Sequence, residues 1–484
     1  MPVRTRFAPS PTGYMHIGKL RTALYAYLIA KKDPEGVFIL RIEDTDQGRL
    51  VEGATDIIYS TMKECGLKHD EGPDVGGDYG PYVQSERVKS GLYMKYAKKL
   101  IERGGAHYCF CDQSVIDAQR EALAGTGESF KYDDPCKKLS REECEKRIAE
   151  GEKFVIRQSI PEEGKTSFDD EVFGTITVDN ATLDEQVLIK SDGFPTYNFA
   201  NVIDDHLMGI TDVVRGMEYL SSSPKYNLIY NAFGWDIPRY IHCPPVMKDE
   251  HNKLSKRNGD ASFQDLVVKG YLPEAILNYI ALLGWAPEED REIYTIEELI
   301  QAFNVKRIGT SGAIFDPEKL KWVNATWLRN MDLDTYYNTV KDYIDEAVKG
   351  DFDKKRIAAI VQPRASTLQE IPPMLGFFDS FPAYENDLYN NKKMKTNPQV
   401  ALESLSAVRD MLAVQDDWSE DALHTKLMEL PAKLGKKNGQ VLFPLRLAIT
   451  GMQTTPGGAI EIAAILGKEE TLRRLDLSIA QLSA

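Results

Sequence analysis

The chain has 484 residues, of which 42% are hydrophobic and 27% charged, and its formal net charge at pH 7 is -15. This length predicts three or four domains rather than one core. No stretch is apolar enough to cross a membrane and the first residues lack a secretory signal, so we expect a cytoplasmic protein without a membrane partner. Six cysteines in so long a chain form no disulfide framework. The acidic total argues weakly against nucleic acid, but leaves room for a local basic face.

The first strand, turn and helix are the stretch around which the chain is organised. Alternation over residues 3–7 predicts a strand, and from residue 20 to 31 apolar side chains recur at helical spacing. His16 and Gly18 therefore lie where a strand leads into the amino terminus of a helix, the junction at which open α/β sheets bind phosphate groups. A lone His-x-Gly is more often an ordinary turn, so this interpretation needs support from elsewhere in the chain.

Residues 37–42 are a continuous apolar run, as expected of a strand buried in a parallel sheet, and a group of carboxylates beginning with Glu43 follows it. The residues alone leave two alternatives for this group: a solvated loop, or a means of holding cations or a substrate amine. A helix is predicted from Ser85, its N-cap, to about Arg103. Two strand-to-helix crossovers are then complete, which is half of a mononucleotide-binding sheet.

The pattern changes between residues 92 and 181, which we interpret as an insertion between two halves of the sheet. Charged helices and then strand-like patterns are predicted there, at 114–123, 140–151, 153–157 and 174–178.

This insertion holds Cys109, Cys111 and Cys136. Thiolates one residue apart can bind one zinc ion, and a later cysteine can add a third ligand. A closed tetrahedral site needs a fourth ligand as well.

Beyond residue 181 we expect the chain to return to the parallel sheet, with a strand at 186–190 and another at 211–216 that ends near Arg215. A helix follows at 221–233, ended by Gly234. By itself Arg215 is an ordinary surface cation. At the end of a core strand, facing the mouth that holds Arg6, it becomes a fork suited to a carboxylate.

Two helices are expected at 273–283 and 295–303. From about residue 330 strand signals vanish and helical periodicity dominates, with helices expected at 334–348, 397–414 and 472–482. Before them lies the basic run 253–257 (KLSKR), which alone would be a solvated loop.

Residues 16–19 (HIGK) and 253–257 (KLSKR) together resemble the HIGH and KMSKS signatures of class I aminoacyl-tRNA synthetases, in that order and near the expected separation. Four more stretches resemble the bacterial-type glutamyl-tRNA synthetases, and the resemblance covers essentially the whole chain. They are residues 6–13 (RFAPSPTG), 40–46 (LRIEDTD), 191–197 (SDGFPTY) and 466–475 (LGKEETLRRL).

The resemblance implies an α/β fold: a class I Rossmann-type nucleotide-binding catalytic domain with an α+β insertion, a stem-contact domain and an all-α C-terminal anticodon-binding region. The expected limits are 1–91 and 182–235 for the catalytic halves, 92–181 for the connective, acceptor-binding insertion, 236–329 for the stem-contact domain with the KLSKR loop, and 330–484 for the anticodon-binding region. The family's usual state, a monomer, is expected here.

The implied activity is that of a glutamate–tRNA ligase, which activates L-glutamate with ATP and Mg²⁺ and transfers it to the 3′ end of tRNA(Glu). Carried over by position, the glutamate pocket consists of Arg6, Ser10, Glu43, Tyr197, Asn201 and Arg215. The ATP-binding positions are His16, Gly18, Glu218, Lys253 and Lys256, of which His16, Lys253 and Lys256 are catalytic. Lys19 departs from the last position of the HIGH pattern; it either adds a phosphate contact or points elsewhere.

Some members of the family hold zinc through Cys-x-Cys and a later Cys-x-His, but here Cys136 is followed by two lysines. The related glutamyl-queuosine synthetases use a tyrosine four residues before the last cysteine, and Tyr132 has that place. The resemblance therefore leaves two alternatives: zinc held by Cys109, Cys111, Tyr132 and Cys136, or a metal-free set of buried thiols.

Two alternative functions differ in their sequence requirements. A glutaminyl-tRNA synthetase shares both signatures, but Arg215 favours an anionic side chain and the helical C-terminal part differs from the β-barrels of that family. A non-catalytic tRNA-binding paralogue would have no need of His16, Lys253 and Lys256, which are all present.

Overall fold

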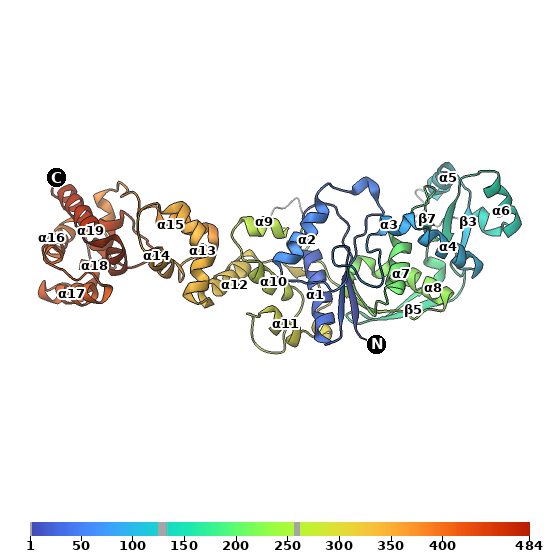
Figure 1. The fold of residues 1–484 in the computed structure, drawn as a ribbon, viewed down its shortest axis with the longest axis horizontal. Helices are drawn as coiled ribbons and strands as arrows, with labels where there is room; N and C mark the ends of the chain where they lie inside the picture. The colour runs from blue at the N-terminus through green and yellow to red at the C-terminus, as the bar shows by residue number, and fades with distance from the viewer. Residues whose placement is uncertain (1, 124–131, 133, 256–261) are drawn as a thin grey trace. The chain divides into compact units, whose positions relative to one another are not determined.

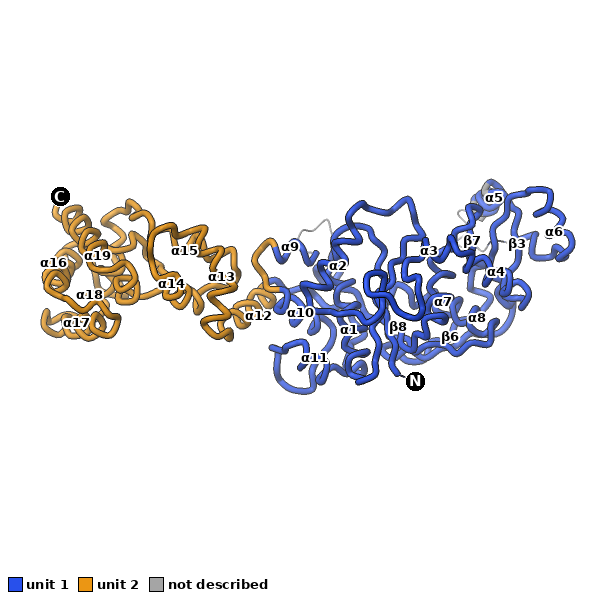
Figure 2. Tube along the Cα trace, viewed as in Figure 1, with its two compact units in different colours: residues 1–267, 273–317 blue, residues 268–272, 318–484 orange. Residues whose placement is uncertain are grey.

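The computed structural model describes residues 2–123, 132, 134–255 and 262–484. It consists of two compact units, shown in different colours in Figure 2. The first contains residues 1–267 and 273–317, and the second contains residues 268–272 and 318–484. Each unit has its own buried apolar side chains.

The first unit combines strands and helices (Figure 1). Its strands are β1 (Arg4–Phe7), β2 (Val37–Leu40), β3 (Ala106–Cys109), β4 (Val155–Gln158), β5 (Lys165–Asp170), β6 (Gly174–Asp179), β7 (Val187–Ile189), β8 (Asp212–Gly216), β9 (Arg239–Cys243), β10 (Val246–Met247) and β11 (Ala313–Ile314). Its helices are α1 (Ile17–Lys32), α2 (Ala54–Glu64), α3 (Gln84–Lys89), α4 (Leu92–Glu102), α5 (Gln113–Leu123), α6 (Arg141–Ala149), α7 (Tyr197–Leu207), α8 (Ser223–Phe233), α9 (Phe263–Val268), α10 (Pro273–Ala281) and α11 (Ile296–Ala302).

Parallel strands from distant parts of the sequence meet beside α1. Strand β1 pairs in parallel with β2, and β8 pairs in parallel with β9. The amide of Thr211, just before β8, donates to the carbonyl of Arg4 at 2.9 Å, which brings β8 next to β1. The carboxyl ends of these strands therefore share one edge, where parallel α/β sheets build their binding sites.

Helix α1 is the centre of this unit. All its residues from Leu20 to Ala30 except Thr22 are buried, and it packs against β1, β8, α10 and α11. A helix that is apolar on nearly every side needs cover on every side, which fixes its amino terminus relative to the strand ends. The predicted strands at 3–7 and 211–216 and the predicted helices at 20–31, 221–233, 273–283 and 295–303 are confirmed to within three residues at their ends.

The single helix predicted from Ser85 to Arg103 is wrong. The chain forms two helices there, α3 and α4, separated by Ser90 and Gly91. Gly91 has a φ of 74°, a left-handed conformation that glycine adopts without strain and that ends α3. Ser85 lies inside α3 rather than at its N-cap, which is Val83.

The strand predicted at 186–190 exists as β7, but its expected place in the parallel sheet is wrong. Strand β7 pairs with β4 in a small antiparallel sheet of order β3-β4-β7. The hairpin β5–β6 lies within the predicted insertion, but it joins the parallel pair β9–β8 in a four-stranded sheet of order β6-β5-β9-β8. Short apolar strands carry a burial pattern but no information about their partner strand, so sequence periodicity could not assign either one to its sheet.

The second unit is helical, as predicted, over its fully described range 318–484. Its helices are α12 (Pro317–Asn330), α13 (Leu333–Ala347), α14 (Lys354–Val361), α15 (Ile371–Leu375), α16 (Pro398–Ala413), α17 (Glu420–Lys433), α18 (Asn438–Thr450) and α19 (Ala459–Ser483). Helices α13 and α14 pack together, and α16, α18 and α19 form a second group.

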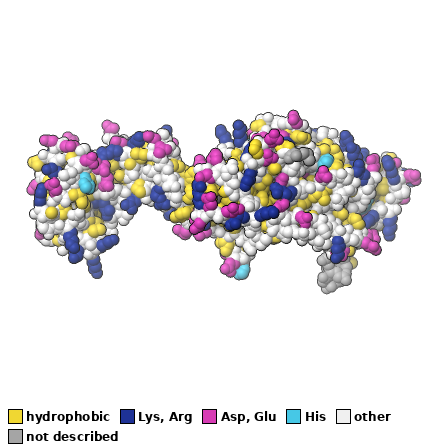
Figure 3. Space-filling view, turned by 90° about the horizontal axis from the view of Figure 1, so that it is seen from below, with side chains coloured by type: hydrophobic (Ala, Val, Ile, Leu, Met, Phe, Trp, Pro, Cys, Tyr) yellow, Lys and Arg dark blue, Asp and Glu magenta, His cyan; other side chains and the backbone are white. Residues whose placement is uncertain are grey.

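Two further features are the apolar character of the helices and the distribution of charged side chains on the surface. Among the described residues, the search for a helix with the length and apolar character of a membrane span found none. On the face shown in Figure 3, acidic and basic side chains are interspersed over both units, so on this face the net charge of -15 is not collected into one acidic patch.

Candidate active site

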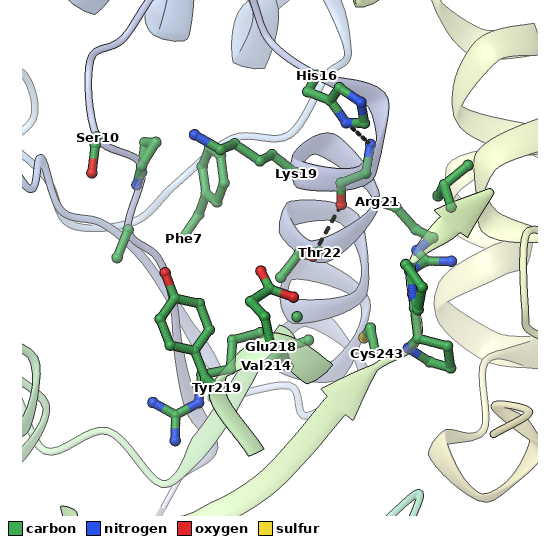
Figure 4. A pocket seen from close by; sticks show the side chains of 18 of the residues that line it. Phe7, Ser10, His16, Lys19, Arg21, Thr22, Val214, Glu218, Tyr219 and Cys243 are labelled. Carbon is green, nitrogen blue, oxygen red and sulfur yellow. Dashed lines mark hydrogen bonds between the residues drawn. The ribbon is translucent and has the colours of Figure 1, made fainter. Parts of the chain in front are cut away.

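A cavity of about 510 Å³ opens at the carboxyl ends of β1 and β8, beside the amino terminus of α1 (Figure 4). It brings together nine of the residues singled out from the sequence: Arg6, Ser10, His16, Gly18, Glu43, Tyr197, Arg215, Glu218 and Lys253. Asn201 does not line it, and Lys256 lies outside the described residues. Lys19 does line it, so the departure from the HIGH pattern places an additional ammonium group at this cavity.

His16 connects the two signature motifs. It is the N-cap of α1, and its Nδ1 accepts a hydrogen bond from the amide of Gly18 at 3.0 Å. Because that amide is only a donor, the proton of the neutral ring is on Nε2, which donates to the carbonyl of Leu254 at 3.1 Å. Leu254 belongs to the KLSKR run, so one imidazole joins the start of α1 to the basic loop.

Gly18 leaves room for this contact. A Cβ at this position would lie 3.1 Å from Nδ1 of His16, so a larger residue would press on the imidazole ring. Gly18 is one of the positions expected to bind ATP, and its amide donates to His16.

A buried ion network supports the β1 side of the cavity. Asp205 on α7 accepts from Arg6 Nε at 3.0 Å and Nη2 at 3.3 Å, and lies 2.8 Å from Arg41 Nη1. Arg41 also lies 3.0 Å from Glu43 Oε1 through its Nη2. Burial acts to raise the pKa of Asp205, but the two guanidinium groups outweigh it and hold that pKa below its ordinary value. Asp205 is therefore an ionised bridge between two arginines.

Glu43 has a different electrostatic balance. Its burial raises the pKa of the carboxyl to about 7, against the opposing influence of Arg41 and Arg6. At neutral pH this carboxyl is poised between its two protonation states. A cationic group arriving in the cavity would favour the ionised form.

Arg215 is buried beside neutral groups. Its guanidinium lies 4.8 Å from the ring centre of Tyr226 and 5.1 Å from that of Tyr240. Among the described residues, no carboxylate lies within the 4.0 Å of an ion pair to Arg215. A buried cation without an anion is costly, so this position favours an anionic ligand.

Tyr197 and Asn201 lie one helical turn apart on α7. The Nδ2 of Asn201 donates to the carbonyl of Tyr197 at 2.7 Å. Tyr197 lines the cavity, with its ring 5.1 Å from that of Tyr219, whereas Asn201 is buried and does not line it. The two sequence-predicted positions therefore differ in their access to the cavity.

Sequence reasoning missed Arg41 and Asp205. Arg41 lies in the run 37–42 that we interpreted as apolar, Asp205 lies in α7 between apolar residues, and both are almost fully buried. A charged residue inside an apolar run is the local signal that could have indicated them, since charges are buried only when they are paired.

The predicted metal-binding cysteines also come together, away from the cavity. One donor atom from each of Cys109, Cys111, Asp134 and Cys136 lies within 4.8 Å of the others. The hydroxyl of Tyr132 is buried and, within the described residues, has no hydrogen-bond partner. Three thiols and an unpartnered hydroxyl are a donor set that suits zinc. Sequence reasoning missed Asp134.

Comparisons with known proteins agree with this geometry. Residues 2–322 match the model of the family "tRNA synthetases class I (E and Q), catalytic domain", and residues 324–479 match "Anticodon binding domain". The chain is 58% identical over 482 residues to a glutamate–tRNA ligase of Clostridium botulinum, covering 100% of this chain and 99% of the relative, and 58% identical over 480 residues to that of Clostridium tetani, covering 99% and 98%.

Solved structures resemble the whole chain as well. A glutamate–tRNA ligase from Elizabethkingia meningosepticum, crystallised with its amino acid, has a TM-score of 0.90 and 33% identity, with 100% of both chains covered. A glutamate–tRNA synthetase from Elizabethkingia anophelis has a TM-score of 0.88 and 34% identity, with 99% of this chain and 100% of that chain covered. The predicted class I fold with a helical anticodon-binding part is confirmed.

The Asp205 bridge gives a test of the buried network. Asp205→Ala leaves two buried guanidinium groups without their shared carboxylate. We therefore expect the free energy of the local unfolding that exposes the α7 amides to fall by about 3–5 kcal/mol. Native-state hydrogen exchange of the α7 amides measures that energy. The matched control is Asp184→Ala, because the carboxylate of Asp184 is exposed and its pair with Lys225 is worth at most about 1 kcal/mol. Equal losses in the two variants would contradict the role given to Asp205.

Proposed function

The chain belongs to the bacterial glutamate–tRNA ligases, aminoacyl-tRNA ligases of class I, and on that basis we propose that its cavity activates L-glutamate with ATP. The glutamyl group then passes from glutamyl-adenylate to the 3′ end of tRNA(Glu). One observation carries the choice of amino acid: Arg215 is a buried guanidinium in the cavity wall with no carboxylate partner among the described residues.

In this proposal Arg215 receives the side-chain carboxylate of glutamate, because guanidinium donors match carboxylate oxygens in pairs. Glu43, a cavity-lining carboxyl, receives the substrate ammonium group. Arg6 lines the same cavity, but Asp205 holds its Nε and Nη2 and the carbonyl of Val214 accepts from its Nη1, so it supplies only the second N–H of each Nη. Ser10 and Tyr197 complete the lining of the glutamate pocket. Asn201 contributes indirectly, by fixing the backbone of Tyr197.

ATP binds on the α1 side of the cavity. We assign it to His16, Gly18, Glu218, Lys253 and Lys256, with Glu218 near the ribose. The substrate carboxylate attacks the α-phosphate and pyrophosphate leaves, so no side chain needs to act as nucleophile. The two lysines neutralise charge that develops on the phosphates, the neutral ring of His16 contributes a hydrogen bond from Nε2 rather than a charge, and Mg²⁺ accompanies ATP.

The contact between His16 and Leu254 suggests how the two motifs cooperate. When ATP binds, its phosphates attract the lysines of the KLSKR run. His16 already contacts this run at the carbonyl of Leu254. Closure of such a loop on the substrate assembles the cationic groups around the reacting atoms only when ATP is present.

The domain limits follow from the same proposal. We place the catalytic halves at 1–91 and 182–235, the acceptor-binding insertion at 92–181, the stem-contact domain at 236–329 and the anticodon-binding region at 330–484. We further propose that the enzyme is a cytoplasmic monomer.

Aminoacylation tests the function directly. Labelled glutamate and labelled glutamine are offered separately with transcripts of tRNA(Glu) and tRNA(Gln). We expect charging of tRNA(Glu) with glutamate and none with glutamine, because only glutamate supplies an anion to Arg215. A preference for glutamine would favour a glutaminyl enzyme, and no charging with either amino acid would favour a non-catalytic tRNA-binding protein.

We propose zinc as a structural ion of the insertion, held by Cys109, Cys111, Cys136 and Tyr132. Asp134 is the competing fourth ligand, but its carboxylate already accepts from the amide of Cys136 at 2.9 Å and lies 3.1 Å from His107 Nε2. The unpartnered hydroxyl of Tyr132 is thus the better candidate. When bound, zinc cross-links β3 to the segment around residue 136 and so stabilises the insertion.

Metal analysis of the purified enzyme tests this assignment. We expect about one zinc per chain after dialysis, and loss of that zinc in Cys136→Ser. Cys144→Ser is the matched control, since Cys144 is a buried cysteine of α6 outside the donor set. Tyr132→Phe and Asp134→Asn then identify the fourth ligand, by which of them weakens zinc retention. A zinc-free wild-type enzyme would support the alternative of a metal-free set of thiols.

A further inference from the structure

Behind Arg215 lies a pair of fully buried polar side chains that neither the sequence motifs nor the proposed pocket includes. His242 on β9 lies next to Arg215 on β8, because the two residues are partners in the parallel strand pairing. Nδ1 of His242 lies 2.6 Å from Asp170 Oδ2, and Nε2 of His242 accepts from Arg215 Nε at 3.1 Å. The side chains of His242 and Asp170 have no exposed surface.

These contacts define the protonation of the imidazole. A guanidinium group only donates, so Nε2 of His242 must carry a lone pair, and the proton of the neutral ring is on Nδ1. Asp170 accepts that proton and thereby fixes the tautomer. Burial lowers the pKa of His242 and Arg215 acts in the same direction, against the opposing influence of Asp170, so the neutral ring is the favoured form.

The guanidinium of Arg215 is held on a second nitrogen as well. Its Nη2 donates to Ser223 Oγ at 2.9 Å, and Ser223 Oγ in turn donates to the carbonyl of Tyr219 at 3.0 Å. Nε and Nη2 are thus committed to neutral acceptors. Within the described part of the chain, no residue accepts a hydrogen bond from Nη1 of Arg215.

Arg6, unlike Arg215, is paired directly with a carboxylate. Its guanidinium contacts the carboxylate of Asp205 directly, so its charge is already compensated by the protein. At Arg215 an imidazole separates the guanidinium from the carboxylate of Asp170. If Asp170 contacted Arg215 directly, its carboxylate would compete with the substrate carboxylate for the guanidinium. The neutral imidazole of His242 instead fixes the orientation of the guanidinium and leaves its charge for the ligand.

We propose that His242 and Asp170 are positioning residues for substrate selection: they orient Arg215 through a neutral imidazole so that its charge stays available for the carboxylate of the bound amino acid. The proposal rests on the function proposed above, in which Arg215 receives that carboxylate. It extends the site to β5, because Asp170 is the last residue of that strand.

Asp170 is itself rigidly held. Its Oδ1 accepts from the amides of Val172 at 3.0 Å and Phe173 at 2.9 Å, and its Oδ2 accepts from the amide of His242 at 3.2 Å. The carboxylate is therefore fixed by the turn between β5 and β6 and by β9. A fixed acceptor is what a tautomer-setting group requires.

Substitution of His242 tests the proposal in the intact enzyme with saturating tRNA(Glu). His242→Leu removes the acceptor for Arg215 Nε, so we expect the KM for glutamate to rise about tenfold to a hundredfold, the range of a hydrogen bond to a charged group. The kcat at saturating glutamate should change by less than about threefold and the KM for ATP should not change, because ground-state binding of one substrate is lost. His242→Gln, which replaces the Nε2 acceptor with a neutral amide oxygen, should restore most of the affinity for glutamate.

The matched control is His206→Leu. His206 stacks on Trp235 at a centroid distance of 3.6 Å and has no part in the cavity, so the KM for glutamate should stay at its wild-type value. Equal effects on glutamate and ATP in His242→Leu, or no recovery in His242→Gln, would mean that His242 is only structural and would overturn the proposal. If the wild-type enzyme does not charge glutamate at all, the proposed function fails instead.

A second measurement does not depend on the leucine variant folding. The chain has seven histidines, so the ring nitrogens of wild-type enzyme labelled at histidine with ¹⁵N give few signals, and the loss of one set in His242→Gln assigns that residue. We expect a proton on Nδ1 and none on Nε2. A proton on Nε2, or a doubly protonated ring, at neutral pH would overturn the proposal.

Discussion

The structure around the cavity depends on how the buried arginines Arg6, Arg41 and Arg215 are compensated. Removing a guanidinium group from water costs free energy that only an anion or a full set of acceptors can offset. Arg6 and Arg41 share the carboxylate of Asp205, and Arg41 also contacts Glu43. Arg215 has only neutral neighbours within ion-pairing reach among the described residues. The first two arginines hold β1, β2 and α7 together, and the third leaves an unmet need for an anion in the cavity wall.

The position of this unmet charge follows from the fold. Parallel strands place their carboxyl ends at one edge, and β8 delivers Arg215 to the same edge at which β1 delivers Arg6 and α1 begins. The amino terminus of α1, at which we propose that phosphate binds, and the guanidinium that we propose binds carboxylate are therefore neighbours. An enzyme that joins a carboxylate to a phosphate needs this proximity, since orientation of the two reactants supplies much of the rate.

Much of the first unit could be predicted because its signals are local. The strand at the start of the chain, the helix after it and the helical second unit follow from periodicity, and nine site residues follow from the resemblance of short motifs. The break at Gly91 was missed because the flanking residues on both sides favour a helix. The partner of β7 was missed because three apolar residues fit either sheet.

The supporting residues of the site were missed for a different reason. Arg41 and Asp205 are far apart in the sequence, as are Asp170 and His242, and each is interpretable only beside its partner. Asp134 likewise gains meaning only when the fold brings it to the three cysteines. A single sequence shows which residues carry charge, but the pairing that decides whether a buried charge is satisfied is a tertiary property.

The central claim is that the uncompensated charge of Arg215 selects glutamate over glutamine. Equilibrium binding of both amino acids to the tRNA-bound enzyme, before and after Arg215→Ala, tests it most directly. The account predicts that affinity for glutamate falls by roughly a hundredfold or more while affinity for glutamine changes little, because only the charged side chain loses its partner. Equal losses for the two amino acids would contradict the account.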